Sequence, residues 1–270
     1  MLRITKEQLQ VFRRLSRQSF VEEMLGHLHQ FTPVHARSLR PKTLRSIIEL
    51  GIQRANGHGW TQRGPVRLYI EVMFTLGSDF DSDPQFPWAA TILGQELADE
   101  LQGIRAHELY RATSTFLDAA AGPDGQYTLD ALRRARAVGL KPAIGPFAEW
   151  DRWMLEELQV LGPEKSRYVG EQDLRDLLRH ARAQARAHGA QTLVDEALIA
   201  LLMFGLGHGC LTDPQFPWIA ATLSARKASG GFGRFERLRG VAMHYLGRMI
   251  ENLSRSRGSQ SVLERRGARS

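Results

Sequence analysis

The chain has 270 residues, of which 43% are hydrophobic and 24% are charged, and its formal net charge is +7. No apolar run approaches the ~20 residues of a membrane-spanning helix, and the N-terminal segment lacks the apolar stretch of a secretory signal. The single cysteine, Cys210, excludes an internal disulfide and any cysteine-based metal cluster. We therefore expect a cytoplasmic globular protein with no metal and no other cofactor.

Hydrophobic periodicity predicts an all-α fold with about eleven helices, and the first three fall before residue 77. Thr5 and Gln8 have the spacing of a capping box ahead of a long periodic run over about 6–31. A second helix is predicted over about 41–56, and a third over 65–76. Both are followed by glycines, which commonly end helices.

The second half of the chain repeats this order of helices. Helices are predicted over 147–161, 171–187 and 193–206, and Thr192 with Asp195 forms a variant of the capping box. The last of the three contains the most apolar run of the chain, so we expect it to be buried. Strand signals are nearly absent throughout.

The hexapeptide DPQFPW occurs twice, at 83–88 and at 213–218, which is a displacement of 130 residues (213 minus 83). At the same displacement other identities align without a gap: Leu44-Arg45 with Leu174-Arg175, His58-Gly59 with His188-Gly189, and Met73-Phe74 with Met203-Phe204. So long a period indicates two copies of a domain rather than a solenoid. We therefore predict a tandem duplication of one helical unit, with the copies related by an approximate two-fold axis.

The boundaries follow from this register and from the composition. We predict a first repeat unit over residues 1–122, a linker helix or turn over 123–145, and a second repeat unit over 146–253. The stretch 118–128 is rich in glycine and contains a proline, which favours a break there. The remaining residues, 254–270, are rich in Ser, Gly and Arg and are predicted to be a flexible basic tail.

The repeated hexapeptide is interpreted as a structural motif that starts a helix. Aspartate is a favoured N-cap and proline suits the first helical turn, while the aromatic residues would anchor the turn to the core. The residues given this role are Asp83, Pro84, Phe86, Pro87 and Trp88 in the first copy and Asp213, Pro214, Phe216, Pro217 and Trp218 in the second. We expect both tryptophans to be largely buried; the rival interpretation makes them binding anchors, as tryptophan is often a hot spot of interfaces.

The two copies differ just before the hexapeptide. The first reads GSDFDSDP and the second GHGCLTDP, so Asp79, Phe80 and Asp81 occur in the first copy only. Neither aspartate is needed to start or stop a helix, so these three residues are the predicted partner-binding site. The alternatives are that the two carboxylates pair with an arginine of a neighbouring helix or are stabilised by the dipole of the following helix, or that the second copy carries the site at Cys210 and Leu211.

A calcium loop is a further interpretation of the D-x-D-x-D spacing. In such a loop a glycine and a bidentate glutamate are needed where this chain has Pro84 and Ala90. The sequence therefore favours no metal site here, and no other motif of the chain predicts catalytic residues.

The first half resembles a group of small bacterial helical proteins that carry the pattern M-F-x-F-G-x-D-F-D-x-D-P-x-x-P-W-A. The matching residues are Met73, Phe74, Gly77, Asp79, Phe80, Asp81, Asp83, Pro84, Pro87, Trp88 and Ala89, with Leu76 in place of the second Phe. This group is associated with gene clusters of type VI secretion effectors and polymorphic toxins. The resemblance implies an accessory role beside a secreted effector and implies no chemistry.

The sequence supports two hypotheses about the function of this protein. The first is a non-enzymatic protein-binding factor, an adaptor, chaperone or immunity-type partner of a secreted effector. The second is a nucleic-acid-binding protein that uses its arginine-rich surface and tail. An enzyme is a third possibility, since the fold could bring titratable groups together from distant parts of the chain.

Overall fold

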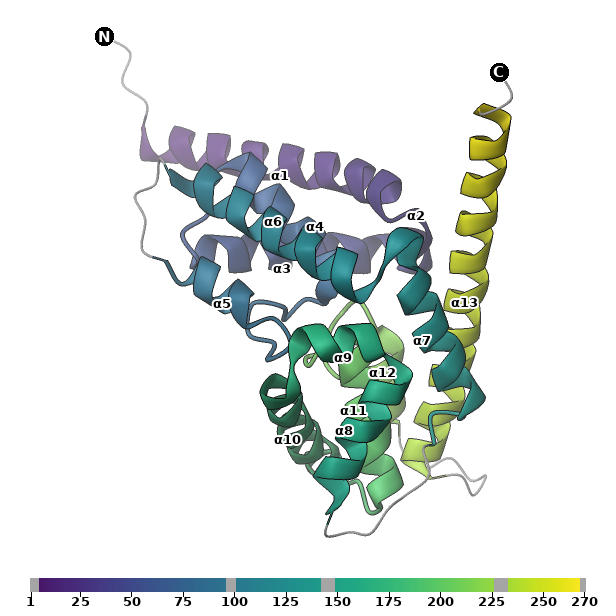
Figure 1. Ribbon diagram of the computed structural model, residues 1–270. Coiled ribbons are helices and arrows are strands. Elements are labelled where there is room, and N and C mark those ends of the chain that lie inside the picture. Colours follow the sequence, from purple (N-terminus) through teal and green to yellow (C-terminus); the bar gives the residue numbers. More distant parts are fainter. Residues whose placement is uncertain (1–4, 96–100, 142–148, 226–232, 268–270) are drawn as a thin grey trace.

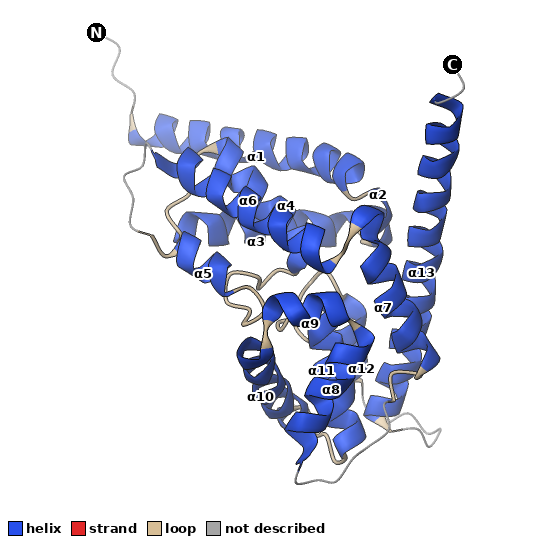
Figure 2. Ribbon diagram, in the orientation of Figure 1, coloured by secondary structure: helices blue, strands red, loops and turns tan. Residues whose placement is uncertain are grey.

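The computed structural model describes residues 5–95, 101–141, 149–225 and 233–267, with backbone only for 256–267. In this part of the chain the protein is all-α, with thirteen α-helices, one short 3-10 helix and no strand (Figures 1 and 2). No helix among these residues combines the length and the apolar character needed to cross a membrane.

The helices follow one another in two series. The first series is α1 (Lys6–Phe31), α2 (Pro33–Ser38), α3 (Pro41–Gly57), α4 (Arg63–Leu76), α5 (Pro87–Leu93) and α6 (Gln102–Ala120). The 3-10 helix η2 (Pro123–Gly125) and α7 (Gln126–Ala137) follow. The second series is α8 (Trp150–Leu161), α9 (Pro163–Val169), α10 (Glu171–Ala187), α11 (Leu193–Leu206), α12 (Pro217–Ser224) and α13 (Arg234–Gly267).

Local signals predicted most of the long helices. Both capping boxes are present: Thr5 caps α1 with Gln8, and Thr192 caps α11 with Asp195. The break predicted around 118–128 lies between α6 and α7. The prediction of about eleven helices was low because the short helices α2 and α9, each only one or two turns after a proline, give little periodicity.

The two series pack in the same pairs. In the first, α3 packs on α4, α4 and α5 on α6, and α1 on α2, α3 and α4. In the second, α10 packs on α11, α11 and α12 on α13, and α8 on α9, α10 and α11. These six pairings therefore recur between corresponding helices of the two series, while α9 packs in addition on α10. An origin by duplication and a two-fold axis stay predictions.

The buried side chains of both series form one continuous hydrophobic core. Between the series, α6 packs on α9, and α7 packs on both α8 and α13 (Figure 1). The apolar run of α11 is buried over Ala197–Phe204, as expected. Residues from 254 onward, predicted as a flexible tail, continue α13 as helix through Gly267, and this end projects beyond the other helices.

Candidate functional site

Two loops face each other where the series meet: the first loop, residues 77–86, and the second loop, residues 207–216. Each begins at a glycine that ends a helix, Gly77 after α4 and Gly207 after α11, with φ of 103° and 96°. A Cβ on Gly77 would stand 2.9 Å from the carbonyl oxygen of Leu206, and one on Gly207 would stand 2.9 Å from that of Leu76. The close approach of the loops therefore requires glycine at both helix ends.

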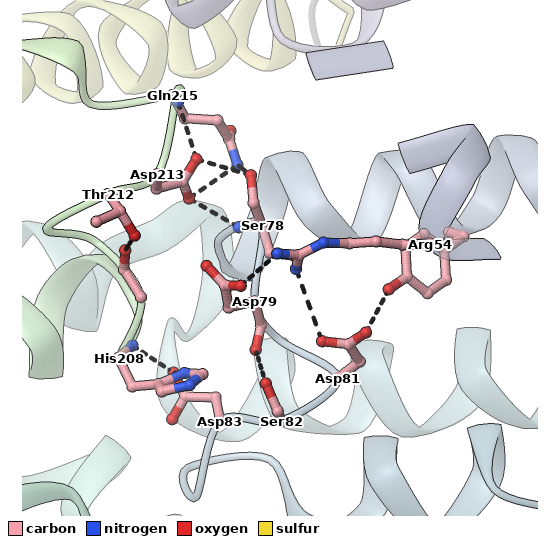
Figure 3. A network of polar contacts seen from close by, with 12 residues as sticks. Arg54, Ser78, Asp79, Asp81, Ser82, Asp83, His208, Thr212, Asp213 and Gln215 are labelled. Carbon is pink, nitrogen blue, oxygen red and sulfur yellow. Dashed lines mark hydrogen bonds and ion pairs between the residues drawn. The ribbon is translucent and has the colours of Figure 1, made fainter. Parts of the chain in front are cut away.

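The aspartates of the hexapeptides bind the opposite loop. Asp213 Oδ2 accepts from the backbone N–H of Ser78 at 2.8 Å, and Asp83 Oδ2 accepts from that of His208 at 2.7 Å (Figure 3). Ser78 and His208 are themselves 130 residues apart. The two carboxylates thus exchange equivalent bonds between the loops.

The glutamines of the hexapeptides repeat this exchange. Gln85 donates to the carbonyl oxygen of Met203 at 3.1 Å, and Gln215 donates to that of Met73 at 2.8 Å. These carbonyls lie in the last turns of α11 and α4 and also accept from the backbone N–H of Gly207 and Gly77. Each hexapeptide therefore adds a second donor at the end of the helix that precedes the other one.

The predicted role of Asp83 and Asp213 as caps of the following helix is wrong. Helices α5 and α12 begin at Pro87 and Pro217, so Pro84 and Pro214 lie in the loops and not in the first turn. The aspartates instead accept from the backbone N–H two residues on, at Gln85 and Gln215, and from the opposite loop. The aspartates do not cap these helices because the backbone of the facing loop donates a second hydrogen bond to the same carboxylate.

The aromatic residues of the hexapeptides divide into two kinds. Phe86 and Phe216 are buried, while Trp88 and Trp218 are half-buried and pack on the edge of the core. The expectation that both tryptophans are largely buried was therefore too strong. In the described part of the chain, the buried indole N–H of each has no hydrogen-bond acceptor.

The predicted partner-binding residues are engaged within the chain. Asp79 pairs with Arg54 of α3, which also donates to the carbonyl of Ser78 (Figure 3). Asp81 accepts from Tyr69 at 2.6 Å and contacts His58 Nε2 at 3.0 Å.

Phe80, between the two aspartates, is buried and packs on Tyr69 with ring centroids 4.9 Å apart. The structure therefore brings the two predicted aspartates into one polar network, the acidic network, defined as Arg54, His58, Tyr69, Asp79 and Asp81, and packs Phe80 against its tyrosine.

The second loop lacks this network because the residues that form it are replaced together in the second half of the chain. At 130 residues after Arg54, Tyr69, Asp79, Phe80 and Asp81 stand Gln184, Ile199, Gly209, Cys210 and Leu211. The arginine, the tyrosine and both carboxylates are thus replaced together, and Ile199, Cys210 and Leu211 are buried. Sequence reasoning identified the aspartates but missed Arg54 and Tyr69, although these also occur in one half only.

Asp79 also explains why the second loop has a glycine. A Cβ on Gly209 would stand 2.0 Å from Asp79 Oδ2 and 2.5 Å from its Cγ. The carboxylate therefore occupies the space that any larger residue at position 209 would need. The two loops differ in sequence partly because they fit each other.

The electrostatics of the carboxylates point to a structural role. Burial alone raises the pKa of Asp83, but the contacts from His208 and the backbone N–H of Gln85 outweigh it and leave the pKa lowered. For Asp81, burial raises the pKa while His58, Tyr69 and Arg54 lower it, and the net direction is down. Burial raises the pKa of the Cys210 thiol well above its usual value, so the sulfur stays protonated at neutral pH.

Two basic side chains are inserted between aromatic rings at equivalent places beside the loops. His35 lies between Phe74 and Phe216, at 5.9 and 5.8 Å between ring centroids. Lys165, 130 residues later, has its Nζ 4.7 Å from the ring centroid of Phe204 and 5.8 Å from that of Phe86. Burial lowers the pKa of Lys165 to about 8.

The loops leave little room for a ligand. The space between them does not admit a molecule the size of water, whereas usual small-molecule sites have several hundred Å³. Within the described ranges no three His, Cys, Asp or Glu side chains are grouped so as to hold a metal ion. The junction therefore joins the two series, and its polar groups are directed at each other.

Comparison with known proteins gave no match: no protein-family model, no curated protein and no solved structure is significantly similar to this chain.

Proposed function

We propose that the protein is a non-enzymatic binding factor, an adaptor, chaperone or immunity-type partner of a secreted bacterial effector, acting in the cytoplasm. The partner surface is placed on the N-terminal half of α1 rather than on Asp79, Phe80 and Asp81. Those three residues are directed at groups of the same chain, and Phe80 is only 1% exposed.

The observation that carries the proposal is an exposed apolar stripe. Every residue from 5 to 19 is exposed, so about half of α1 lies outside the core. This half carries four large apolar side chains, Leu9, Val11, Phe12 and Leu15, with 42–57% of their surface exposed. We call these four residues the α1 stripe.

The α1 stripe does not continue the core-facing side of the helix. At about 100° per residue, it is centred opposite to the buried residues of the same helix, Phe20, Val21, Met24 and Leu28. The N-terminal half of α1 thus presents an apolar side to solvent, whereas its C-terminal half presents an apolar side to the core. An apolar helix face of this kind is a common docking surface for a protein partner.

The nucleic-acid alternative gains less support from the arrangement of arginines. Helix α10 carries Arg175, Arg179, Arg182 and Arg186 along one side, yet each of them pairs with a carboxylate. Their partners are Glu171, Asp176, Asp151 and Glu196. A surface balanced in this way attracts phosphates weakly.

The experiment compares two exposed aromatic residues of equal exposure, Phe12 in the α1 stripe and Tyr110 on α6, both 57% exposed. Proteins that co-purify with the tagged chain from its host are identified for the wild type, Phe12→Glu and Tyr110→Glu. We expect a protein partner that Phe12→Glu loses and Tyr110→Glu keeps, at unchanged melting temperature of both variants. The proposal is refuted if Phe12→Glu still captures the partner protein. It is also refuted if capture weakens steeply as the salt concentration rises and is restored by adding nucleic acid.

A further inference from the structure

We propose that His208 and His180 form a proton-sensing pair, which makes the junction of the two series most stable when one of the two rings is protonated. The junction is weaker when neither ring or both rings carry a proton. His208 belongs to the second loop and His180 to α10, and their rings are in contact. The inference goes beyond the proposed function and does not depend on the α1 stripe.

The two sets of bonds that the loops exchange differ in one side chain. Asp213 accepts from the backbone N–H of Ser78 and also from its hydroxyl, at 2.7 Å. At the equivalent place Asp83 accepts from the backbone N–H of His208, and its Oδ2 lies 3.4 Å from the ring Nδ1 (Figure 3). A hydroxyl keeps its proton at neutral pH, whereas an imidazole changes its charge there. Near neutral pH, therefore, one set of bonds is insensitive to pH and the other is sensitive.

The surroundings of His208 favour its protonated form. Its Nδ1 is shielded from solvent, and the carboxylate of Asp83 is at ion-pair distance from it. Burial lowers the pKa of His208, but Asp83 raises it more, Asp79 and Asp81 of the first loop act in the same direction as Asp83, and the net direction is up. A proton on this ring therefore strengthens the attachment of the second loop to the first.

His180 is the second ring of the pair and favours its neutral form. Its centroid lies 5.3 Å from that of His208. Burial and the charge on His208 lower the pKa of His180, Asp83 acts in the opposite direction, and the net direction is down. Two positive rings at this separation repel each other, so a second proton opposes the contact that the first one strengthens. The first series has an apolar residue, Leu50, at the place of His180.

The other titratable groups around the pair act at other pH values or are common to the proteins compared below. The net pKa of Asp81 and of Asp83 is lowered, and the buried thiol of Cys210 stays protonated. Lys165 of α9, whose charge acts on Asp83, has a pKa of about 8. Burial also lowers the pKa of His35, which affects stability in the same direction as His180, so variants are needed to isolate the pair.

The effect on stability follows from the two directions. A histidine whose pKa is raised in the folded chain adds stability that is fully present below its unfolded value of about 6.5 and is lost as the pH rises through the folded value. His208 is of this kind. A histidine whose pKa is lowered costs stability as the pH falls from about 6.5 through the folded value, and His180 is of this kind. The pair therefore stabilises the junction most near pH 6.5 and less on either side.

The first test is an NMR titration of the imidazole rings in the full-length chain, with His208→Ser and His180→Leu as variants. Each variant introduces the residue that the first series has at the equivalent place, Ser78 or Leu50. In the wild type we expect the midpoint of His208 above 6.5 and that of His180 below it. In His208→Ser the midpoint of His180 should rise, because the neighbouring charge is gone. In His180→Leu the midpoint of His208 should stay nearly unchanged, because its proton binds first.

The second test is urea unfolding of the same proteins between pH 5 and pH 8. His208→Ser should lose the decrease in stability that the wild type shows as the pH rises from 6.5. His180→Leu should lessen the decrease that the wild type shows as the pH falls from 6.5. The control is His107→Ser, which removes an exposed histidine of α6 and should follow the wild type.

Three results would overturn the inference. Midpoints of both rings on the same side of 6.5 in the wild type would do so without any variant. A midpoint of His180 that does not move in His208→Ser would show that the rings are not coupled. A stability profile of His208→Ser parallel to that of the wild type would show that the ring does not act on the junction. Since none of these measurements involves a partner captured through Phe12, the inference and the proposed function are tested separately.

Discussion

Replacing Gly209 by alanine tests whether the two loops fit as described. The backbone of Gly209 does not have a positive φ, so alanine itself introduces no backbone strain there. The added Cβ would, however, stand 2.0 Å from Asp79 Oδ2, which is far below any ordinary contact. The Asp79 side chain must therefore move, and its pairing with Arg54 is lost or weakened.

The size of the effect follows from this pairing. A hydrogen bond between charged groups contributes about 1.5–3 kcal/mol. The Asp79 and Arg54 side chains are 24% and 27% exposed, so the lower part of that range applies. We expect Gly209→Ala to reduce the free energy of unfolding by about 1.5–2 kcal/mol, which lowers the melting temperature by about 3–8 °C.

Thermal and denaturant unfolding of five chains provide the assay: the wild type, Gly209→Ala, Gly205→Ala, Asp79→Gly and the double variant Asp79→Gly with Gly209→Ala. Gly205→Ala is the matched control, because a Cβ there meets nothing within 4 Å on the exposed side of α11, and it should stabilise by about 0.5–1 kcal/mol. In the background Asp79→Gly, the change Gly209→Ala should cost almost nothing, since the clash is gone. If Gly209→Ala costs the same in both backgrounds, Asp79 does not occupy that space and the reasoning is wrong.

Two further predictions concern the same junction. Gly77→Ala and Gly207→Ala should each destabilise the fold by about 2 kcal/mol or more, because a backbone near φ 100° and ψ 150° is almost restricted to glycine and the facing carbonyl is 2.9 Å away; unfolding midpoints equal to wild type would contradict the close approach. The pKa of Lys165 is lowered to about 8 from an ordinary 10.5, so between these pH values the unfolded chain binds a proton that the folded chain does not, and the free energy of unfolding should rise with pH. Unfolding curves of wild type and Lys165→Met between pH 7 and 10.5 measure this rise, which the variant should lack; parallel profiles would show that the amine is not buried.

At the acidic network, comparison of the two halves of the sequence predicted the two aspartates but not the residues that they contact. Asp79 and Asp81 could be singled out because the second half of the chain lacks them. What they contact could not be derived, since Arg54 and Tyr69 lie on two other helices. The alternative that an arginine of a neighbouring helix pairs with these carboxylates describes the structure, while their role toward a partner stays a prediction.

The α1 stripe was equally hidden in the sequence. Its apolar residues and the core-facing ones lie on opposite sides of one helix, so the sequence predicts a long helix without telling which parts of it meet the core. Only the packing of α1 on α2, α3 and α4 shows that the core ends near Phe20 and leaves residues 5–19 exposed.

The sequence by itself determined six of the long helices, α1, α3, α4, α8, α10 and α11, and their order, because capping, glycine stops and apolar periodicity act between residues a few positions apart. Thr5 with Gln8, Thr192 with Asp195, and Gly77 and Gly207 are examples in which local chemistry was sufficient. Tertiary structure alone decided what the hexapeptide does. The carboxylates of Asp83 and Asp213 have donors within their own loops and donors in the opposite loop, 125 and 135 residues away along the chain. Such bonds depend on how the folded units meet, and no local pattern encodes that arrangement.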